Sequence, residues 1–146
     1  MYDDILVPTD GSDVVDTAAS HAIDLASLCD ATVHAVYAIE PDNATLPSEV
    51  MRHEEVQQEH LDWGEEITTE IANRARDRGL EGVAAVTEGI PYEEIGDYAV
   101  ENDIDLIVMG TAGRTGLRER LIGSVTEKTV RTAEVPVLTM RDYDAE

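Results

Sequence analysis

The sequence predicts an α/β fold in which one doubly wound, five-stranded parallel sheet is covered by helices on both faces. Two observations lead to this prediction. Short apolar runs alternate with longer amphipathic segments, and turn residues such as Gly and Pro separate the two kinds of segment. This alternation is typical of parallel sheets whose crossover connections are helices. For a chain of 146 residues we expect one domain, covering residues 1–146.

The first quarter of the chain predicts a strand, a turn, a helix and a second strand. Residues 2–8 form a largely apolar run that residues 9–11 (Thr-Asp-Gly) close, which indicates a buried strand followed by a turn. Ser12 or Asp13 then caps a helix, because apolar side chains recur behind them at helical spacing. Residues 32–39 are mostly apolar and rich in β-branched side chains, so they predict the second strand.

The middle of the chain predicts a long helix, a strand, a shorter helix and another strand. Residues 48–78 carry apolar side chains three or four positions apart, which is the spacing of an amphipathic helix. Residues 83–87 predict the third strand. Pro91 starts the third helix, because proline is favoured in a first turn. Residues 105–109 predict the fourth strand.

The last part of the chain predicts a helix that starts near Ser124 and a fifth strand that begins at Val135 and ends at Met140. Pro136 cannot donate a hydrogen bond to a neighbouring strand, so we place the fifth strand at an edge of the sheet. An exposed apolar edge invites pairing with another chain. We therefore expect a homodimer joined through the fifth strand.

The charge balance disfavours two classes of partner. The chain has 32 acidic and 10 basic residues and a formal net charge of −22, so it repels nucleic acid phosphates and anionic lipid headgroups. We expect no nucleic acid partner and no membrane partner, and we expect a cytoplasmic protein, since no apolar run approaches the roughly 20 residues of a membrane span. Lys128 is the only lysine and phenylalanine is absent, a composition that resembles that of halophilic proteins.

Residues 110–124 are the most informative segment, because they follow a predicted buried strand and run into a predicted helix. Glycines here let backbone N–H groups converge on an anion, and the start of the helix adds partial positive charge. The segment also gathers basic side chains in an acidic chain, namely Arg114, Arg118 and Arg120. The pattern indicates an anion site. The alternative is that the glycines only shape a loop, that Ser124 and Glu127 form a capping box, and that the arginines neutralise nearby acids.

Three parts of the sequence resemble the universal stress protein family. Its ATP-binding signature G-x2-G-x9-G-S is met by Gly110, Gly113, Gly123 and Ser124. Residues 5–12 (ILVPTDGS) resemble the family's first strand and turn, and residues 125–130 and 135–138 resemble its last helix and strand. The resemblance therefore covers nearly the whole chain. It implies a Rossmann-like fold and a protein that binds ATP, for which we expect Mg²⁺ or Mn²⁺ as the accompanying ion.

The resemblance also implies which residues contact the nucleotide. Asp10 would contact the nucleoside, with Pro8 and Thr9 beside it. Ala38, at the end of the second strand, would line the adenine pocket, and Met109 would cover the base. The ribose and phosphates would be wrapped by the remaining signature residues, with Ser124 giving its hydroxyl: Gly110, Gly113, Arg114, Gly123, Ser124 and Val125.

We expect a regulatory stress-response protein that binds ATP without efficient turnover, because no motif assigns a catalytic residue or a metal ligand. A slow ATPase or a nucleotidyl-transfer enzyme on the same fold is the alternative. The phosphate-binding motif G-x4-G-K-[ST] is absent. A phospho-acceptor receiver domain would need an aspartate ending the third strand and a lysine ending the fifth, where Thr87-Glu88 and Thr139-Met140-Arg141 stand instead.

Two histidines of the long predicted helix are candidate metal ligands. His53 and His60 lie seven residues apart and share a helix face. A metal site would need a third ligand that the sequence does not place, so we interpret both as partly buried histidines.

Overall fold

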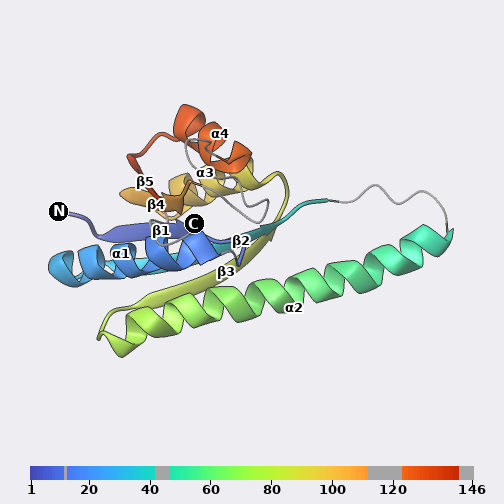
Figure 1. Ribbon diagram of the computed structural model, residues 1–146, viewed down its shortest axis with the longest axis horizontal. Helices are drawn as coiled ribbons and strands as arrows, with labels where there is room; N and C mark the ends of the chain where they lie inside the picture. The colour runs from blue at the N-terminus through green and yellow to red at the C-terminus, as the bar shows by residue number, and fades with distance from the viewer. Residues whose placement is uncertain (12, 42–46, 112–122, 142–146) are drawn as a thin grey trace.

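The computed structural model describes residues 1–11, 13–41, 47–111 and 123–141. Along these residues strands alternate with helices in the order β1 (Asp4–Pro8), α1 (Asp13–Cys29), β2 (Thr32–Ile39), α2 (Pro47–Asp77), β3 (Gly82–Glu88), α3 (Pro91–Glu101), β4 (Leu106–Gly110), α4 (Ser124–Thr132) and β5 (Val137–Met140). The strands form one parallel sheet in the order β3-β2-β1-β4-β5 (Figure 1). The predicted α/β fold is confirmed.

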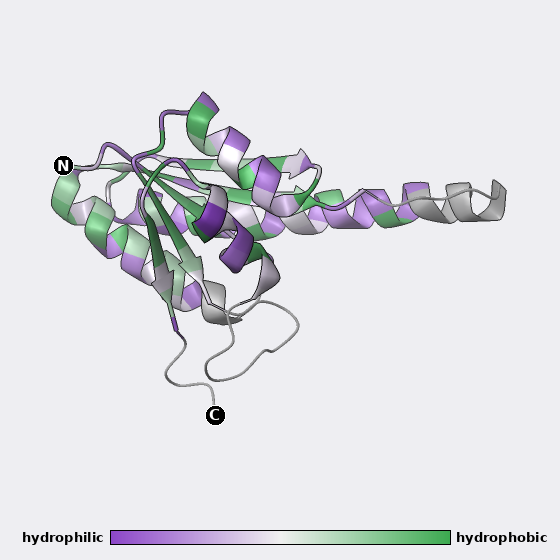
Figure 2. Cartoon of the chain, turned by 90° about the horizontal axis from the view of Figure 1, so that it is seen from above, coloured by the Kyte–Doolittle hydropathy of each residue, from purple (hydrophilic) through white to green (hydrophobic). Residues whose placement is uncertain are grey.

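The sheet is doubly wound, because alternate side chains of its central strand enter two separate cores. Ile5 and Val7 of β1 pack with apolar residues of α1 and α2, whereas Leu6 between them packs with those of α3. All three side chains are fully buried. Figure 1 shows the two helix layers on opposite sides of the sheet, and Figure 2 shows the apolar strands that they enclose. A strand buried on both faces has a continuous apolar run, which is how this strand could be predicted.

The second helix is longer than the sheet that it covers. α2 has 31 residues, about 46 Å at 1.5 Å per residue. Buried side chains of its carboxyl-terminal half pack on the sheet, while the helix continues past the ends of the strands (Figures 1 and 2). The predicted long amphipathic helix is confirmed. Among the described residues no helix, α2 included, is both long and apolar enough to cross a membrane.

The fifth strand is shorter than predicted. β5 begins at Val137 rather than Val135, because Pro136 has no N–H to give to the ladder. Pro136 contributes its carbonyl instead, which accepts a hydrogen bond of 3.0 Å from the N–H of Ile107. β5 lies at an edge of the sheet, as the proline predicted.

The start of α4 differs from the capping box considered above. The N-cap is Gly123, no side chain of the described residues caps the helix, and the N–H of Glu127 donates to the Gly123 carbonyl over 2.9 Å. A capping box needs the serine at the N-cap, but Ser124 is the first helical residue, one position after the N-cap. The capping-box interpretation is therefore wrong. The cap considered for α1 at Ser12 lies outside the described residues.

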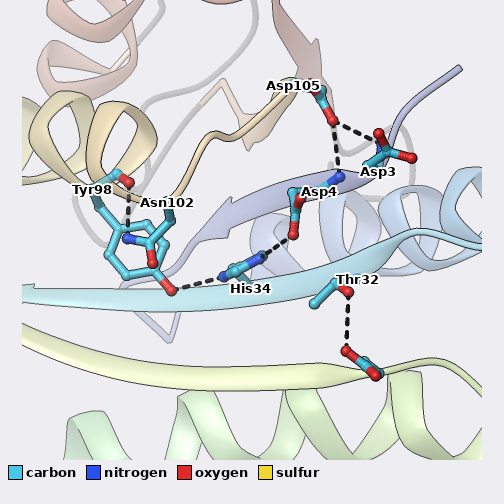
Figure 3. Close-up of polar contacts among 8 residues, drawn as sticks. Asp3, Asp4, Thr32, His34, Tyr98, Asn102 and Asp105 are labelled. Atoms are coloured by element: carbon cyan, nitrogen blue, oxygen red, sulfur yellow. Dashed lines mark hydrogen bonds and ion pairs between the residues drawn. The ribbon is translucent and has the colours of Figure 1, made fainter.

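A polar network joins β1, β2, α3 and the start of β4 at the amino ends of the strands (Figure 3). Asp105 Oδ2 accepts hydrogen bonds from the N–H groups of Asp3, over 2.7 Å, and Asp4, over 3.0 Å. Asp4 Oδ1 lies 2.9 Å from His34 Nε2, and His34 Nδ1 lies 2.8 Å from the hydroxyl of Tyr98. The chain of contacts therefore links a strand to the helix that covers it.

Candidate functional site

The candidate site lies where the carboxyl ends of three neighbouring strands meet. β1 lies between β2 and β4, so the order of strands along the chain reverses at this point, and open α/β sheets bind ligands at such a reversal. Pro8 ends β1, Ala38 is the penultimate residue of β2, and Met109 and Gly110 end β4. The structure brings these four predicted residues together at the carboxyl ends of the strands.

The turn after β1 is fixed by two hydrogen bonds and an indole ring. The N–H of Thr9 donates to the carbonyl of Val36 over 2.9 Å, and the N–H of Gly11 donates to Thr9 Oγ1 over 3.1 Å. Gly11 has a φ of +82°, which favours glycine, and a Cβ there would lie 2.5 Å from Trp63 Cζ2. Asp10, which is half-buried, therefore lies in a turn that these contacts hold in one conformation.

Trp63 is a neighbour of the site that no sequence pattern predicts. Its spacing on α2 predicted only a place on an apolar helix face, and 37% of the residue is exposed. The contact with Gly11 depends on the path of α2 past the end of β1, for which the sequence carries no local signal.

The segment between β4 and α4 is tied together at its two ends. The N–H of Gly123 donates to the carbonyl of Thr111, and the Thr126 hydroxyl donates to the carbonyl of Gly110 over 2.8 Å. These bonds hold the first turn of α4, with Ser124 and Val125, beside the end of β4. The remaining signature residues, Gly113 and Arg114, lie outside the described residues, as do Arg118 and Arg120.

A buried hydroxyl beside Ala38 has no hydrogen-bond partner among the described residues. Ala38 is paired in register with Thr87 of β3, and both lie on the sheet face that Val36 turns towards α3. Thr87 Oγ1 is buried and has no hydrogen-bond partner in the described part of the chain. Leaving a buried hydroxyl unbonded costs free energy. A ligand atom that bonded to this hydroxyl would offset that cost.

A cleft of about 300 Å³ opens beside the first turn of α4. It is lined by residues that follow β2, begin α3 and begin α4: Glu40, Pro41, Ile90, Pro91, Tyr92, Ser124, Val125 and Lys128. Lys128 Nζ lies 5.4 Å from the centre of the Tyr92 ring. Apart from Ser124 and Val125, these residues were not assigned to a site from the sequence.

Of the two histidines on α2, the structure describes one side chain. His60 is half-buried, and its Nδ1 is buried without a hydrogen-bond partner among the described residues. The side chain of His53 lies outside them.

Residues 1–141 match the universal stress protein family. The chain belongs to this family. Universal stress protein MJ0531 of Methanocaldococcus jannaschii is 38% identical over 142 residues, which cover 97% of this chain and 83% of that protein. The solved structure of universal stress protein UspA from Lactobacillus plantarum is 26% identical, with a TM-score of 0.86, and the match covers 96% of this chain and 98% of that one. The resemblance found in the sequence is confirmed.

Two similar family structures hold nucleotides. The universal stress protein from Archaeoglobus fulgidus in complex with dAMP is 26% identical, with a TM-score of 0.63, and the match covers 94% of this chain and 97% of that one. A universal stress protein in complex with cAMP is 25% identical, with a TM-score of 0.70, and the match covers 95% of this chain and 97% of that one. Both ligands are adenine nucleotides, so family members with this fold bind that class of molecule.

Proposed function

We propose that this chain is a cytoplasmic regulatory protein of the stress response that binds ATP at the carboxyl ends of β1, β2 and β4 without efficient turnover. One observation carries the proposal: the described residues of the ATP-binding pattern converge where the strand order reverses. They are Pro8, Thr9, Asp10, Ala38, Met109, Gly110, Gly123, Ser124 and Val125. The dAMP and cAMP complexes of related proteins support an adenine nucleotide as the ligand.

The nucleoside would lie over the ends of the strands. The Asp10 carboxylate is an acceptor for the ribose hydroxyls, and its turn is fixed by Thr9 and Gly11. Met109, which is buried, would cover the base, and Ala38 would line its pocket. The Thr87 hydroxyl beside Ala38, which has no partner among the described residues, supports a polar ligand here, because a base edge offers both donors and acceptors.

The phosphates would lie against the start of α4. Gly110, Gly123, Ser124 and Val125 would wrap them together with Gly113 and Arg114. The Ser124 hydroxyl is exposed and makes no hydrogen bond within the described residues, so it is available to a phosphate oxygen. The described part of the chain contains no group of three or more His, Cys, Asp or Glu side chains that could hold a metal ion. We therefore propose that Mg²⁺ or Mn²⁺ arrives with ATP and is held by its phosphate oxygens.

Calorimetric titration with ATP and Mg²⁺ in high salt tests this function. We expect binding to the wild type and its loss in Gly113→Val, because a side chain at that position would intrude where backbone N–H groups approach phosphate. Glu54→Ala, an exposed position of α2, is the control and should bind as the wild type does. Equal affinity of the wild type and Gly113→Val would reject the site. Rapid phosphate release would instead place the protein in the alternative enzyme class.

We also propose a homodimer that joins through β5. The strand lies at the edge of the sheet, and its unpaired side could bond to the same strand of a second copy around a two-fold axis. Light scattering at micromolar protein in high salt should give twice the monomer mass. A monomer mass under these conditions would refute the pairing.

A further inference from the structure

The cleft beside α4 contains the only lysine of an acidic chain. The chain has 32 acidic residues, yet Lys128 forms no ion pair with a carboxylate among the residues described. By contrast, Arg74 forms an ion pair with Asp16, Arg78 with Asp24, and Arg131 with Glu127. The ammonium group of Lys128 contacts an aromatic ring instead, so its charge is available to a ligand.

The cleft aligns this cation with a hydroxyl. Ser124 and Lys128 are four residues apart on α4, which places them on one face of the helix, and both line the cleft. Tyr92, at the start of α3, holds Lys128 Nζ 5.4 Å from its ring centre, a distance at which a cation is attracted to the ring face. A cation and a hydroxyl one helical turn apart are suited to the oxygens of a phosphoryl group.

We propose that this cleft takes the terminal phosphoryl groups of the bound nucleotide and that Lys128 makes ATP and ADP bind more tightly than AMP. The inference rests on the proposed function, because Ser124 and Val125 belong to both the nucleotide site and the cleft. Phosphates that lie against Ser124 reach the cleft directly. The cleft therefore extends the site along α4 and adds a residue that reads the number of phosphates.

Glu40 adds a negative charge to the same cleft. Its carboxylate repels a bare phosphoryl group, so the cleft favours a nucleotide whose phosphates carry a divalent cation. Glu40→Gln should therefore strengthen ATP binding in the absence of Mg²⁺ more than in its presence.

Titration of ATP, ADP and AMP into the wild type and three variants tests the role of Lys128. In Lys128→Gln we expect ATP and ADP to bind about tenfold more weakly, the size expected for a lost charge-assisted contact, with little change for AMP. Lys128→Arg keeps the positive charge and should retain most of the preference for ATP and ADP over AMP. Arg131→Gln is the matched control, because it removes the same charge from the exposed end of the same helix, where Arg131 pairs with Glu127 over 3.0 Å. It should leave all three affinities unchanged.

The outcomes separate this inference from the proposed function. If ATP and AMP bind the wild type equally, or if Lys128→Gln weakens all three nucleotides alike, the inference fails and the proposed function stands. If the wild type binds no nucleotide, both fail. Tyr92→Phe and Tyr92→Leu add a positioning test: the first keeps the ring and should keep the preference for ATP, and the second should lose it. A preference for ATP that survives Lys128→Gln also overturns the inference.

Discussion

The two ends of the parallel sheet differ in how completely their polar side chains are bonded. At the amino ends of the strands, Asp4, His34, Tyr98 and Asp105 bond to one another or to backbone N–H groups (Figure 3). At the carboxyl ends, the hydroxyls of Thr87 and Ser124 and the ammonium of Lys128 have no hydrogen-bonding or ionic partner in the described part of the chain.

This difference fits the proposed division between stability at one end of the sheet and nucleotide binding at the other. A buried polar network whose members are all bonded fixes the elements that it joins. Polar groups left unbonded keep their capacity for a ligand and cost some stability until one binds. An Asp-His-Tyr chain has the composition of a proton relay, but here it lies at the end of the sheet away from the candidate site. We therefore expect it to act on folding and not on nucleotide binding.

Replacing His34 with alanine should give the largest effect. His34 is 7% exposed, and its loss leaves the Asp4 carboxylate and the Tyr98 hydroxyl without their partners. We expect the free energy of unfolding to fall by about 3 kcal/mol, while ATP affinity at the opposite end of the sheet stays unchanged. Urea denaturation and calorimetry measure the two quantities. His21→Ala, at a half-buried position of α1, is the control, and a loss of ATP affinity in folded His34→Ala would contradict the separation of the two ends.

A change at Gly11 should affect both stability and binding. Gly11→Ala imposes a positive φ on an alanine and brings its Cβ within 2.5 Å of the Trp63 ring. We expect a loss of about 2 kcal/mol in stability together with weaker ATP binding, because the adjoining Asp10 moves. In the double variant Gly11→Ala/Trp63→Ala the steric clash is gone and only the backbone strain remains. If adding Trp63→Ala recovers neither the stability nor the ATP affinity, the Trp63 contact does not position the turn.

The fold could be predicted because burial leaves a signal in the sequence. β1 and β4 are buried on both faces and have continuous apolar runs, while α2 has one apolar stripe. The start of α4 near Ser124 was predicted, but its cap was not. A serine followed by an acidic residue three positions later suggests a serine cap, whereas Gly123 is the N-cap and the helix starts one residue earlier than that cap would place it. The homodimer and the halophilic origin stay predictions.

The described part of the candidate site follows from the family resemblance, but its neighbours do not. Trp63 reaches Gly11, and Lys128 reaches Tyr92, through contacts between elements far apart in the chain. No local pattern of residues specifies such contacts, because they depend on how α2 lies beside β1 and how α4 lies beside α3.

A smaller effect is expected at Tyr98, and it depends on pH. Burial, and secondarily the Asp4 carboxylate, raise the pKa of Tyr98 above its usual 10.0. The folded protein therefore keeps this proton to a higher pH than the unfolded chain does, so the stabilisation is complete below pH 10 and is lost as pH rises through the folded pKa. Tyr98→Phe should cost about 1 kcal/mol near neutral pH, because His34 Nδ1 loses its partner. Between about pH 9 and pH 11 the stability of the Tyr98→Phe variant should fall less steeply than that of the wild type. Urea midpoints of the two proteins that fall in parallel with pH would argue against this.

The smallest change in stability is expected at Ser124, and a neighbouring residue makes the comparison sharp. Ser124 is exposed, lies at the first position of α4 and caps no described residue, so Ser124→Ala should alter the free energy of unfolding by less than about 0.5 kcal/mol. Its hydroxyl is nonetheless available to phosphate, so ATP affinity should fall clearly. Thr126, two residues later, is buried, and its hydroxyl donates to the Gly110 carbonyl over 2.8 Å. Thr126→Val should therefore cost about 1 kcal/mol of stability, because it leaves that carbonyl without its donor. Urea denaturation and ATP titration of both variants give a two-by-two test, in which an unstable Ser124→Ala with normal affinity would show that this serine serves the helix rather than the ligand.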